Sequence, residues 1–410
     1  MFGHGRPPIA SAPPEQQPSD PDLHDEHREE IADREEDLRV SGLLADKRRL
    51  VSIGLVFVLA IGGIYFILPK LLGLDEAINR IDEAEWYWIV VAVLFNVAAF
   101  AAYVALFRGI LGGRDSSDVR ERLDAKASYQ ITMAGLAATR IFSAAGAGGI
   151  VLTYWALRKA GMPRKESASR MVAFNVLLYA VYMLTLVING ILLRTGVFNG
   201  PAPAGLTIVP AAVAGGMIAI FLFIALIPGN LERRFSTASQ HRFWGRWARR
   251  LATVPSTLAV GTREAMVFVR DPSRGGLALI GAIGFWATQI AILWASFKAF
   301  DAHVPLAVVV QAFFVGMAAN MLPTPGGVGA VDAGLIGTFV LFGVSGVGAT
   351  VIPAVLLYRL VAFWLPMLPG VIAFAQLRRT VVRWSADSPA RLAVAERTRL
   401  TETSTSESKV

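Results

Sequence analysis

The chain has 410 residues, of which 54% are hydrophobic and 17% charged, and its formal net charge is +8. Long runs nearly free of charge are typical of a polytopic membrane protein rather than of two or three soluble domains. The sequence contains no cysteine, which excludes disulfides and thiolate metal or redox sites.

The two ends of the chain are polar. Residues 1–49 carry 12 acids against 7 bases, and we expect residues 1–45 and 381–410 to be disordered cytoplasmic tails. Residues 46–380 would then form one transmembrane domain. The amino end has no basic segment followed by an apolar core, so we predict no cleavable signal peptide, and the first apolar run would remain as an anchor.

The spans themselves are predicted from apolar runs. Six runs are each close to the roughly 20 residues that cross a hydrocarbon core. They are Leu50–Leu68, Trp86–Phe107, Met171–Leu193, Gly205–Ile227, Gly275–Ala299 and Thr350–Phe374. Two further apolar stretches, Ser128–Leu157 and Val304–Phe342, are interrupted by glycine.

Basic residues predict the topology, because cytoplasmic loops are enriched in Lys and Arg. The Lys47-Arg-Arg49 run places the amino end inside, and the acidic loop 69–85 lies outside. The basic loops 108–127 and 158–170 belong inside. Loop 229–274 carries nine arginines against three acids and also lies inside, where we expect it to meet anionic headgroups. A basic carboxyl end places both termini in the cytoplasm.

The stretch Ser128–Leu157 begins and ends at inside loops, yet its two halves are short for full crossings. About 15 residues of helix reach only about 22 Å. We therefore predict a re-entrant hairpin that enters from the cytoplasm and turns near Gly146–Gly149. The alternative is a single kinked span that violates the inside-loop rule once.

The stretch Val304–Phe342 begins and ends outside. It forms either a second re-entrant hairpin, turning at Pro323–Gly327, or two short full spans, and topology alone does not distinguish them. Two broken elements that open to opposite sides predict an inverted repeat, with a substrate site near the midplane where they meet. The predicted fold is thus an all-α membrane bundle of about six spans and two broken hairpins.

The motif Asn320-Met-Leu-Pro-Thr-Pro-Gly-Gly-Val-Gly-Ala-Val-Asp332 has two prolines and three glycines in an apolar region. Irregular backbone at membrane depth survives only where protein or a wet cavity covers it. Free N–H groups at a helix start favour anions, so Gly326, Gly327 and Gly329 are candidate binding residues. Among the polar side chains of this motif, Asn320 and Thr324 are further candidates. The alternative is that these glycines only allow close helix packing.

Ionisable residues inside the membrane are rare and are normally paired or face a cavity. Arg140, Asp332 and Arg359 are the candidates here. Asp332 and Arg359 could form an ion pair, or the arginines could bind phosphate through their forked donors. Other polar residues in the spans are interpreted as helix–helix hydrogen bonds: Asn96, Asn175, Asn189, Gln289 and Gln311.

The Asn320–Asp332 motif, followed by Leu356-Leu-Tyr-Arg-Leu-x-x-Phe-Trp364, resembles the signature of the lysylphosphatidylglycerol synthase transmembrane family, also called flippase-like. The likeness covers roughly residues 45–380. It implies a multi-span domain of the bacterial inner membrane that moves lipids between leaflets. The positions that match are Asn320, Pro323, Pro325, Gly326, Gly327, Gly329, Asp332, Tyr358, Arg359 and Trp364.

The chain departs from the family pattern in two respects. The family commonly has Glu where this chain has Asp332, which shortens the arm of the carboxylate. Residues 381–410 are too few for a catalytic synthase domain, so we expect a transporter rather than an enzyme.

The resulting hypothesis is a flippase or scramblase for a phosphate-headgroup lipid, either a phospholipid or a polyprenyl-phosphate derivative. Arg140, Arg359, Tyr358 and the Gly326–Gly329 backbone would hold the headgroup, and Asp332 is the candidate for ion coupling. We expect membrane lipids as partners and no metal, cofactor or nucleic acid.

Two other functions remain open. The chain could be a non-transporting scaffold for a lipid synthase supplied in trans. It could instead be a polyprenyl-phosphate-dependent glycosyltransferase that uses the outer acids Asp82, Glu83 and Glu85. The sequence does not determine which lipid is moved, in which direction, with what energy source, or in what oligomeric state.

Overall fold

Helices account for all the regular structure in the part of the chain that the computed structural model describes, namely residues 84–111, 117–141, 147–226, 258–322 and 324–384. These residues belong to the unit Leu68–Val410. The predicted span Leu50–Leu68, the amino-terminal tail, Asp82, Glu83, Pro323 and most of the carboxyl-terminal tail lie outside the described residues.

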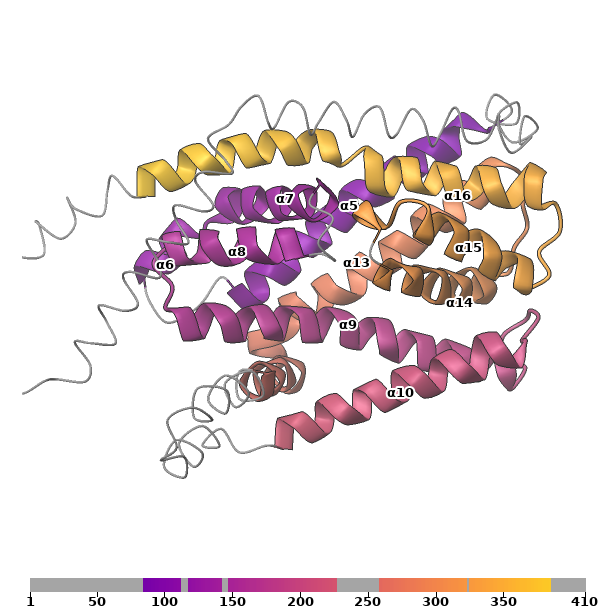
Figure 1. Ribbon diagram of the computed structural model, residues 1–410, viewed down its shortest axis with the longest axis horizontal. Coiled ribbons are helices and arrows are strands. Elements are labelled where there is room, and N and C mark those ends of the chain that lie inside the picture. Colours follow the sequence, from indigo (N-terminus) through magenta and orange to yellow (C-terminus); the bar gives the residue numbers. More distant parts are fainter. Residues whose placement is uncertain (1–83, 112–116, 142–146, 227–257, 323, 385–410) are drawn as a thin grey trace, which may run out of the picture. The chain divides into compact units, whose positions relative to one another are not determined.

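Five helical segments within the described ranges are long and apolar enough to cross a membrane, which agrees with the predicted polytopic bundle. Figure 1 shows four of them as labelled helices and the fifth as the segment that contains α16. They are α5 (Trp86–Leu111), α9 (Arg164–Arg194), α10 (Ala204–Leu226), α13 (Pro272–Ala299) and the continuous segment Val347–Trp384. The last comprises the π-helical η5 (Val347–Val351), α16 (Ile352–Arg359), the π-helical η6 (Leu360–Trp364) and helical residues 367–384.

Two predicted loops are shorter than expected, because helices extend into them. α9 begins at Arg164, inside the predicted loop 158–170. Residues 258–270 of the predicted loop 229–274 are helical, and Asp271 then accepts a hydrogen bond from the Ser273 N–H at 3.0 Å to start α13. Hydropathy marks only the part of a helix that lies in lipid, so polar helix ends are missed. For the same reason the last span continues to Trp384, beyond the predicted end at Phe374.

α5 and α13 pack antiparallel along their full lengths, with small residues at the contact. At one end the Glu85 N–H donates to the Ala299 carbonyl, and at the other Gly109 lies against the backbone of Ala278. Near the middle, a Cβ on Gly281 would lie 2.7 Å from the Ala102 carbonyl oxygen. The backbones therefore approach as closely as only glycine allows, which is the usual role of small residues between membrane helices.

We expect Gly281→Ala to destabilise the protein by about 1–3 kcal/mol, because the added methyl group meets backbone that cannot rotate away. Gly276→Ala is the matched control: a Cβ at Gly276, in the same helix, meets nothing within 4 Å. That change should be neutral or stabilising by up to about 1 kcal/mol, since alanine is the better helix former. Unfolding in detergent micelles measures both; equal effects would contradict the close packing.

The stretch predicted as the first broken element forms two antiparallel helices, α7 (Ala125–Ile141) and α8 (Ala147–Lys159). Gly135 and Gly149 face each other across the pair, where a Cβ on Gly149 would lie 2.6 Å from the Gly135 carbonyl oxygen. The hairpin is therefore confirmed over the single kinked span. Of the predicted turn near Gly146–Gly149, residues 147–149 belong to α8, where Gly149 packs against Gly135. The link between the two helices, residues 142–146, lies outside the described residues.

The second broken element is also a hairpin. α14 (Leu306–Met317) and α15 (Ala330–Leu341) have 12 residues each, so each is about 18 Å long and too short for a full crossing of about 30 Å. Between them lie the 3₁₀ turns η3 (Ala318–Met321) and η4 (Pro325–Gly327), where the prolines and glycines of the motif predicted the break. The lengths favour the re-entrant alternative over two full spans.

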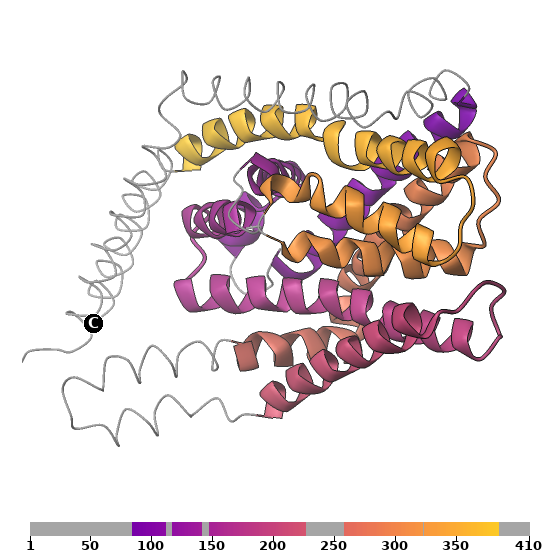
Figure 2. The same cartoon turned by 45° about the vertical axis from the view of Figure 1, so that its right-hand side comes forward.

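The two hairpins meet tip to tip. Arg140, at the end of α7, places its carbonyl oxygen 3.1 Å from where a Cβ on Gly326 would stand. Figures 1 and 2 show α7 and α8 approaching this junction from one end of the helical unit and α14 and α15 from the other. Each hairpin is followed by a long helix, α9 or the α16 segment, running in opposite directions. This order agrees with the predicted inverted repeat.

A proline inside α10 creates a bond between helices. Pro210 has no N–H to donate to the Leu206 carbonyl four residues earlier. The Gln311 side chain of α14 donates to that carbonyl at 3.0 Å, and the Asn189 amide of α9 donates to Gln311 Oε1, also at 3.0 Å. The predicted helix–helix role of Asn189 and Gln311 is therefore confirmed, and neighbouring side chains satisfy the backbone that proline leaves free.

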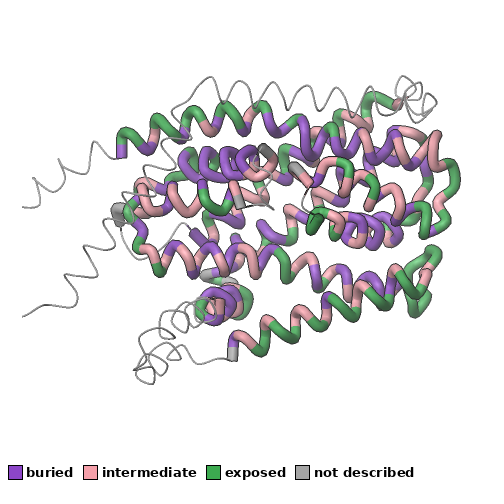
Figure 3. The backbone as a smooth tube through the Cα atoms, viewed as in Figure 1, coloured by how far each residue is buried: buried purple, intermediate pink, exposed green. Residues whose placement is uncertain are grey.

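The outer surface of the bundle is apolar. Figure 3 shows exposed residues along much of α10, and these include Ile208, Val213, Ile220 and Phe223. An exposed apolar face of this extent is unfavourable in water but is matched by lipid tails.

Candidate functional site

Arg140 joins the first hairpin to the last helix. Its Nη1 donates to the Phe363 carbonyl at 2.7 Å and its Nη2 to the Ala362 carbonyl at 3.0 Å. The Ala362 carbonyl is available because Pro366, four residues on, lacks an N–H. η6 is π-helical at this point, which is a geometry often found at functional sites. Pro366 therefore leaves the Ala362 carbonyl free to accept, and the fold places Arg140 beside it.

Phe363 lies between the charged groups of the site. The guanidinium carbon of Arg140 is 4.9 Å from the centroid of its ring, and that of Arg359 is 4.3 Å. Both distances allow cation–π attraction. Gly326 packs on the same ring, since a Cβ there would lie 2.7 Å from Phe363 Cζ. The aromatic ring therefore holds two cations and the tip of the second hairpin in one place.

Arg359 and Asp332 form the ion pair that was one of the two interpretations of these residues. Arg359 Nε lies 2.9 Å from Asp332 Oδ1, and the two side chains are 5% and 13% exposed. The contact is ionic, because the Nε–H group does not point at the oxygen with hydrogen-bond geometry. Asp332 Oδ2 also accepts from the Gly329 N–H at 2.8 Å and so caps the first turn of α15. Arg359 Nη2 is buried without a hydrogen-bond partner among the described residues.

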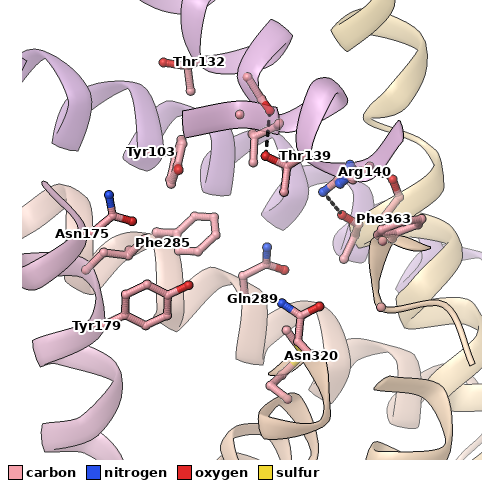
Figure 4. A pocket seen from close by; sticks show the side chains of 18 of the residues that line it. Tyr103, Thr132, Thr139, Arg140, Asn175, Tyr179, Phe285, Gln289, Asn320 and Phe363 are labelled. Carbon is pink, nitrogen blue, oxygen red and sulfur yellow. Dashed lines mark hydrogen bonds between the residues drawn. The ribbon is translucent and has the colours of Figure 1, made fainter. Parts of the chain in front are cut away.

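A cavity of about 410 Å³ lies between the hairpin tips and is lined by residues of α5, α7, α8, α9, α13, α14, α15, η3, η4 and the α16 segment. Such a volume is in the range of ligand sites. Figure 4 shows Arg140 and Phe363 on one side of this space, with Gln289 and Asn320 beside it. The lining also includes apolar and aromatic side chains, among them Phe107, Phe174, Leu178, Phe285 and Trp286.

The structure brings most of the predicted binding residues to this cavity. Its lining includes Arg140, Asn320, Thr324, Gly326, Gly327, Tyr358 and Arg359. Gly329, Asp332 and Trp364 do not line it; Trp364 is buried and packs edge-on against Phe363 with ring centroids 4.8 Å apart. Pro325 begins η4.

The predicted backbone anion site has two of its donors already engaged. The Gly327 N–H donates to the Thr324 carbonyl at 3.1 Å, and the Gly329 N–H is held by Asp332. These internal bonds shape the tip between the two hairpin helices. Among the described residues, the positively charged groups that line the cavity are the side chains of Arg140 and Arg359.

Several residues that line the cavity were not predicted from the sequence to bind a ligand. Gln289 and Asn175 were interpreted as helix–helix hydrogen bonds, yet Asn175 donates within its own helix, to the Met171 carbonyl at 2.9 Å. Gln289 Oε1 is buried without a hydrogen-bond partner in the described part of the chain. A polar residue in an apolar helix was the available signal, but only the packing distinguishes a bridging amide from one that faces a cavity. Phe363 lies within the second motif, but it was not predicted as a site residue.

The fold and this site define a class: a multi-pass helical membrane protein with an internal cavity, partly polar and arginine-bearing, between two broken hairpins. The chain belongs to the family described as the lysylphosphatidylglycerol synthase TM region, whose model matches residues 50–370. The resemblance seen in the two motifs is thereby confirmed, and it marks the chain as a lipid-related membrane protein. A comparison with curated proteins found no match.

Proposed function

We propose that the protein translocates a phosphate-headgroup lipid between the leaflets of the bacterial inner membrane, with both termini in the cytoplasm. The headgroup would enter the cavity between the hairpin tips, and the tails would remain in lipid. The observation that carries the proposal is that two guanidiniums line this cavity. Among the described residues only one carboxylate pairs with them, so one positive charge remains.

The charge of Arg140 supports an anionic ligand. Arg359 is neutralised by Asp332, whereas the partners of Arg140 among the described residues are two carbonyls and an aromatic ring. A cation at membrane depth without a counter-ion is costly. A phosphate would supply the missing charge, and guanidinium donors suit its oxygens. The unpartnered Nη2 of Arg359 offers a further donor at the same place.

The position of the cavity supports translocation. It lies at the junction of two hairpins that enter from opposite ends, where inverted-repeat transporters place their substrate. Rocking of one half against the other would expose it alternately to the two sides. The role of Asp332 in ion coupling remains a prediction, since its carboxylate is held by Arg359 and the Gly329 N–H.

The test is lipid translocation by the purified protein in proteoliposomes, comparing wild type with Arg140→Gln. Glutamine retains a donor for the η6 carbonyls but removes the charge. We expect the rate to fall by about tenfold or more, since a hydrogen bond to a charged group contributes about 1.5–3 kcal/mol.

Arg194→Gln is the matched control, because Arg194 is an exposed arginine at the α9–α10 turn, outside the cavity. This variant should translocate as wild type does. A folded Arg140→Gln protein with an unchanged rate would rule out the headgroup role of Arg140. Absence of movement by folded wild-type protein for any phosphate lipid would instead favour the scaffold for a synthase supplied in trans.

The glycosyltransferase alternative gains no support from the described outer acid. Glu85 is exposed, accepts from the Tyr87 hydroxyl, and does not line the cavity.

A further inference from the structure

The charged residues that line the cavity are all cationic in the described part of the chain. Arg140 and Arg359 are the only charged residues among the described residues that line it. Residues 142–146, which lie outside the described part of the chain, contain no ionisable residue. With Asp332 paired to Arg359, the site retains one positive charge that a ligand could balance. A ligand part that is itself cationic would meet no described carboxylate here.

Uncharged polar groups supply the rest of the polar lining. Figure 4 shows the Gln289 and Asn320 amides and the Tyr179 hydroxyl directed toward the same space from α13, η3 and α9. Gln289 Oε1 and Thr324 Oγ1 are buried and have no hydrogen-bond partner in the described residues. A buried polar atom without a partner is costly, so such atoms indicate a ligand that would satisfy them.

Hydroxyl groups match this lining. A hydroxyl donates to an amide oxygen and accepts from an amide or guanidinium N–H, so it satisfies both kinds of group at once. An ammonium group only donates, and it would add a positive charge to a site that already has an excess of one.

We propose that the lipid headgroup beyond the phosphate is uncharged and rich in hydroxyls, so that the substrate is a mono-anionic phosphodiester lipid carrying glycerol, another polyol or a sugar. This inference rests on the proposed function and specifies its substrate class. A single phosphodiester balances the surplus charge. A zwitterionic ethanolamine lipid leaves the surplus in place, and an aminoacylated headgroup increases it.

The first test measures wild-type protein in proteoliposomes with four labelled lipids. Phosphatidylglycerol and phosphatidylinositol should move at least about tenfold faster than phosphatidylethanolamine and lysyl-phosphatidylglycerol, because an unpaired like charge costs several kcal/mol. Equal or inverted rates would overturn the headgroup inference and leave translocation intact. No movement of any lipid would overturn the proposed function together with the inference.

A soluble anion could offer the same chemistry. Labelled glycerophosphoglycerol, which is the phosphatidylglycerol headgroup without tails, should not accumulate inside the vesicles. Its uptake at the rate of the lipid would overturn the assignment to a lipid.

The second test changes the charge of the lining. Gln289→Glu adds a carboxylate with nearly the same shape, and we expect the preference for phosphatidylglycerol over phosphatidylethanolamine to fall by about tenfold or more. Gln376→Glu is the matched control, since Gln376 is exposed on the last helix and does not line the cavity. An unchanged preference in folded Gln289→Glu protein would contradict the proposal. The four-lipid comparison needs no variant, so it decides the inference even if this variant fails to fold.

Discussion

Neutralising Arg359 or Asp332 alone will destabilise the protein by about 3–5 kcal/mol, because either change leaves the other charge buried without its partner. Both side chains are at most 13% exposed. The double variant Arg359→Gln/Asp332→Asn should cost less than the sum of the two single changes, since it leaves no isolated charge. We expect a coupling energy of about 1–3 kcal/mol. Unfolding of the four proteins in detergent micelles measures it.

The control for this cycle is an ion pair of similar length on α9. Arg170 and Glu166 lie one turn apart on α9 with their charged atoms 2.7 Å apart, but Glu166 is 31% exposed. Glu166→Gln should therefore cost no more than about 1 kcal/mol. Additive costs for Arg359 and Asp332 would show that their contact contributes nothing specific to the fold.

Gly326→Ala should destabilise the hairpin junction by about 2–4 kcal/mol and abolish most translocation. Gly326 has a φ of 59°, in the left-handed region that costs other residues about 1–2 kcal/mol. Its added methyl group would also press on Phe363 and on the Arg140 carbonyl, so it would separate the two hairpin tips at the cavity.

Gly329→Ala separates these two effects. Gly329 also has a positive φ, of 80°, but a Cβ there meets nothing within 4 Å. Its ψ of −52° puts this backbone outside the left-handed helical region, so the strain should be about 1–3 kcal/mol, and translocation should persist. Stability and translocation of both variants are measured in parallel. If the two glycines respond alike, contact between the hairpin tips does not govern activity.

Much of the architecture could be predicted from the sequence. The long apolar runs marked the membrane helices, because lipid selects apolar side chains over the length of a crossing. Pro323 to Gly327 marked the break between α14 and α15, since proline lacks an N–H and Gly326 takes a conformation that other residues avoid. Periodicity could not place helix ends in polar segments, which explains the early start of α9 and the late end at Trp384.

The composition of the site was harder to predict. Arg140, Asp332 and Arg359 stood out as charges in apolar segments, because a membrane tolerates few of them. Their sequence positions, however, allowed both an ion pair and a phosphate site. Only the structure shows their partners: Arg359 is paired with Asp332, while Arg140 donates to the carbonyls of Ala362 and Phe363.

By itself, the sequence determined that this is a membrane bundle with two interrupted apolar segments, because hydropathy, proline and glycine act locally along the chain. Only the tertiary structure decided which polar side chains face a cavity and which join helices. Gln311 and Gln289 are both amides in apolar helices, yet Gln311 bonds to the carbonyl freed by Pro210. Gln289 lines the cavity, and its Oε1 has no hydrogen-bond partner among the described residues. That difference depends on what a neighbouring helix places opposite each residue, and this follows from packing between segments far apart in the chain.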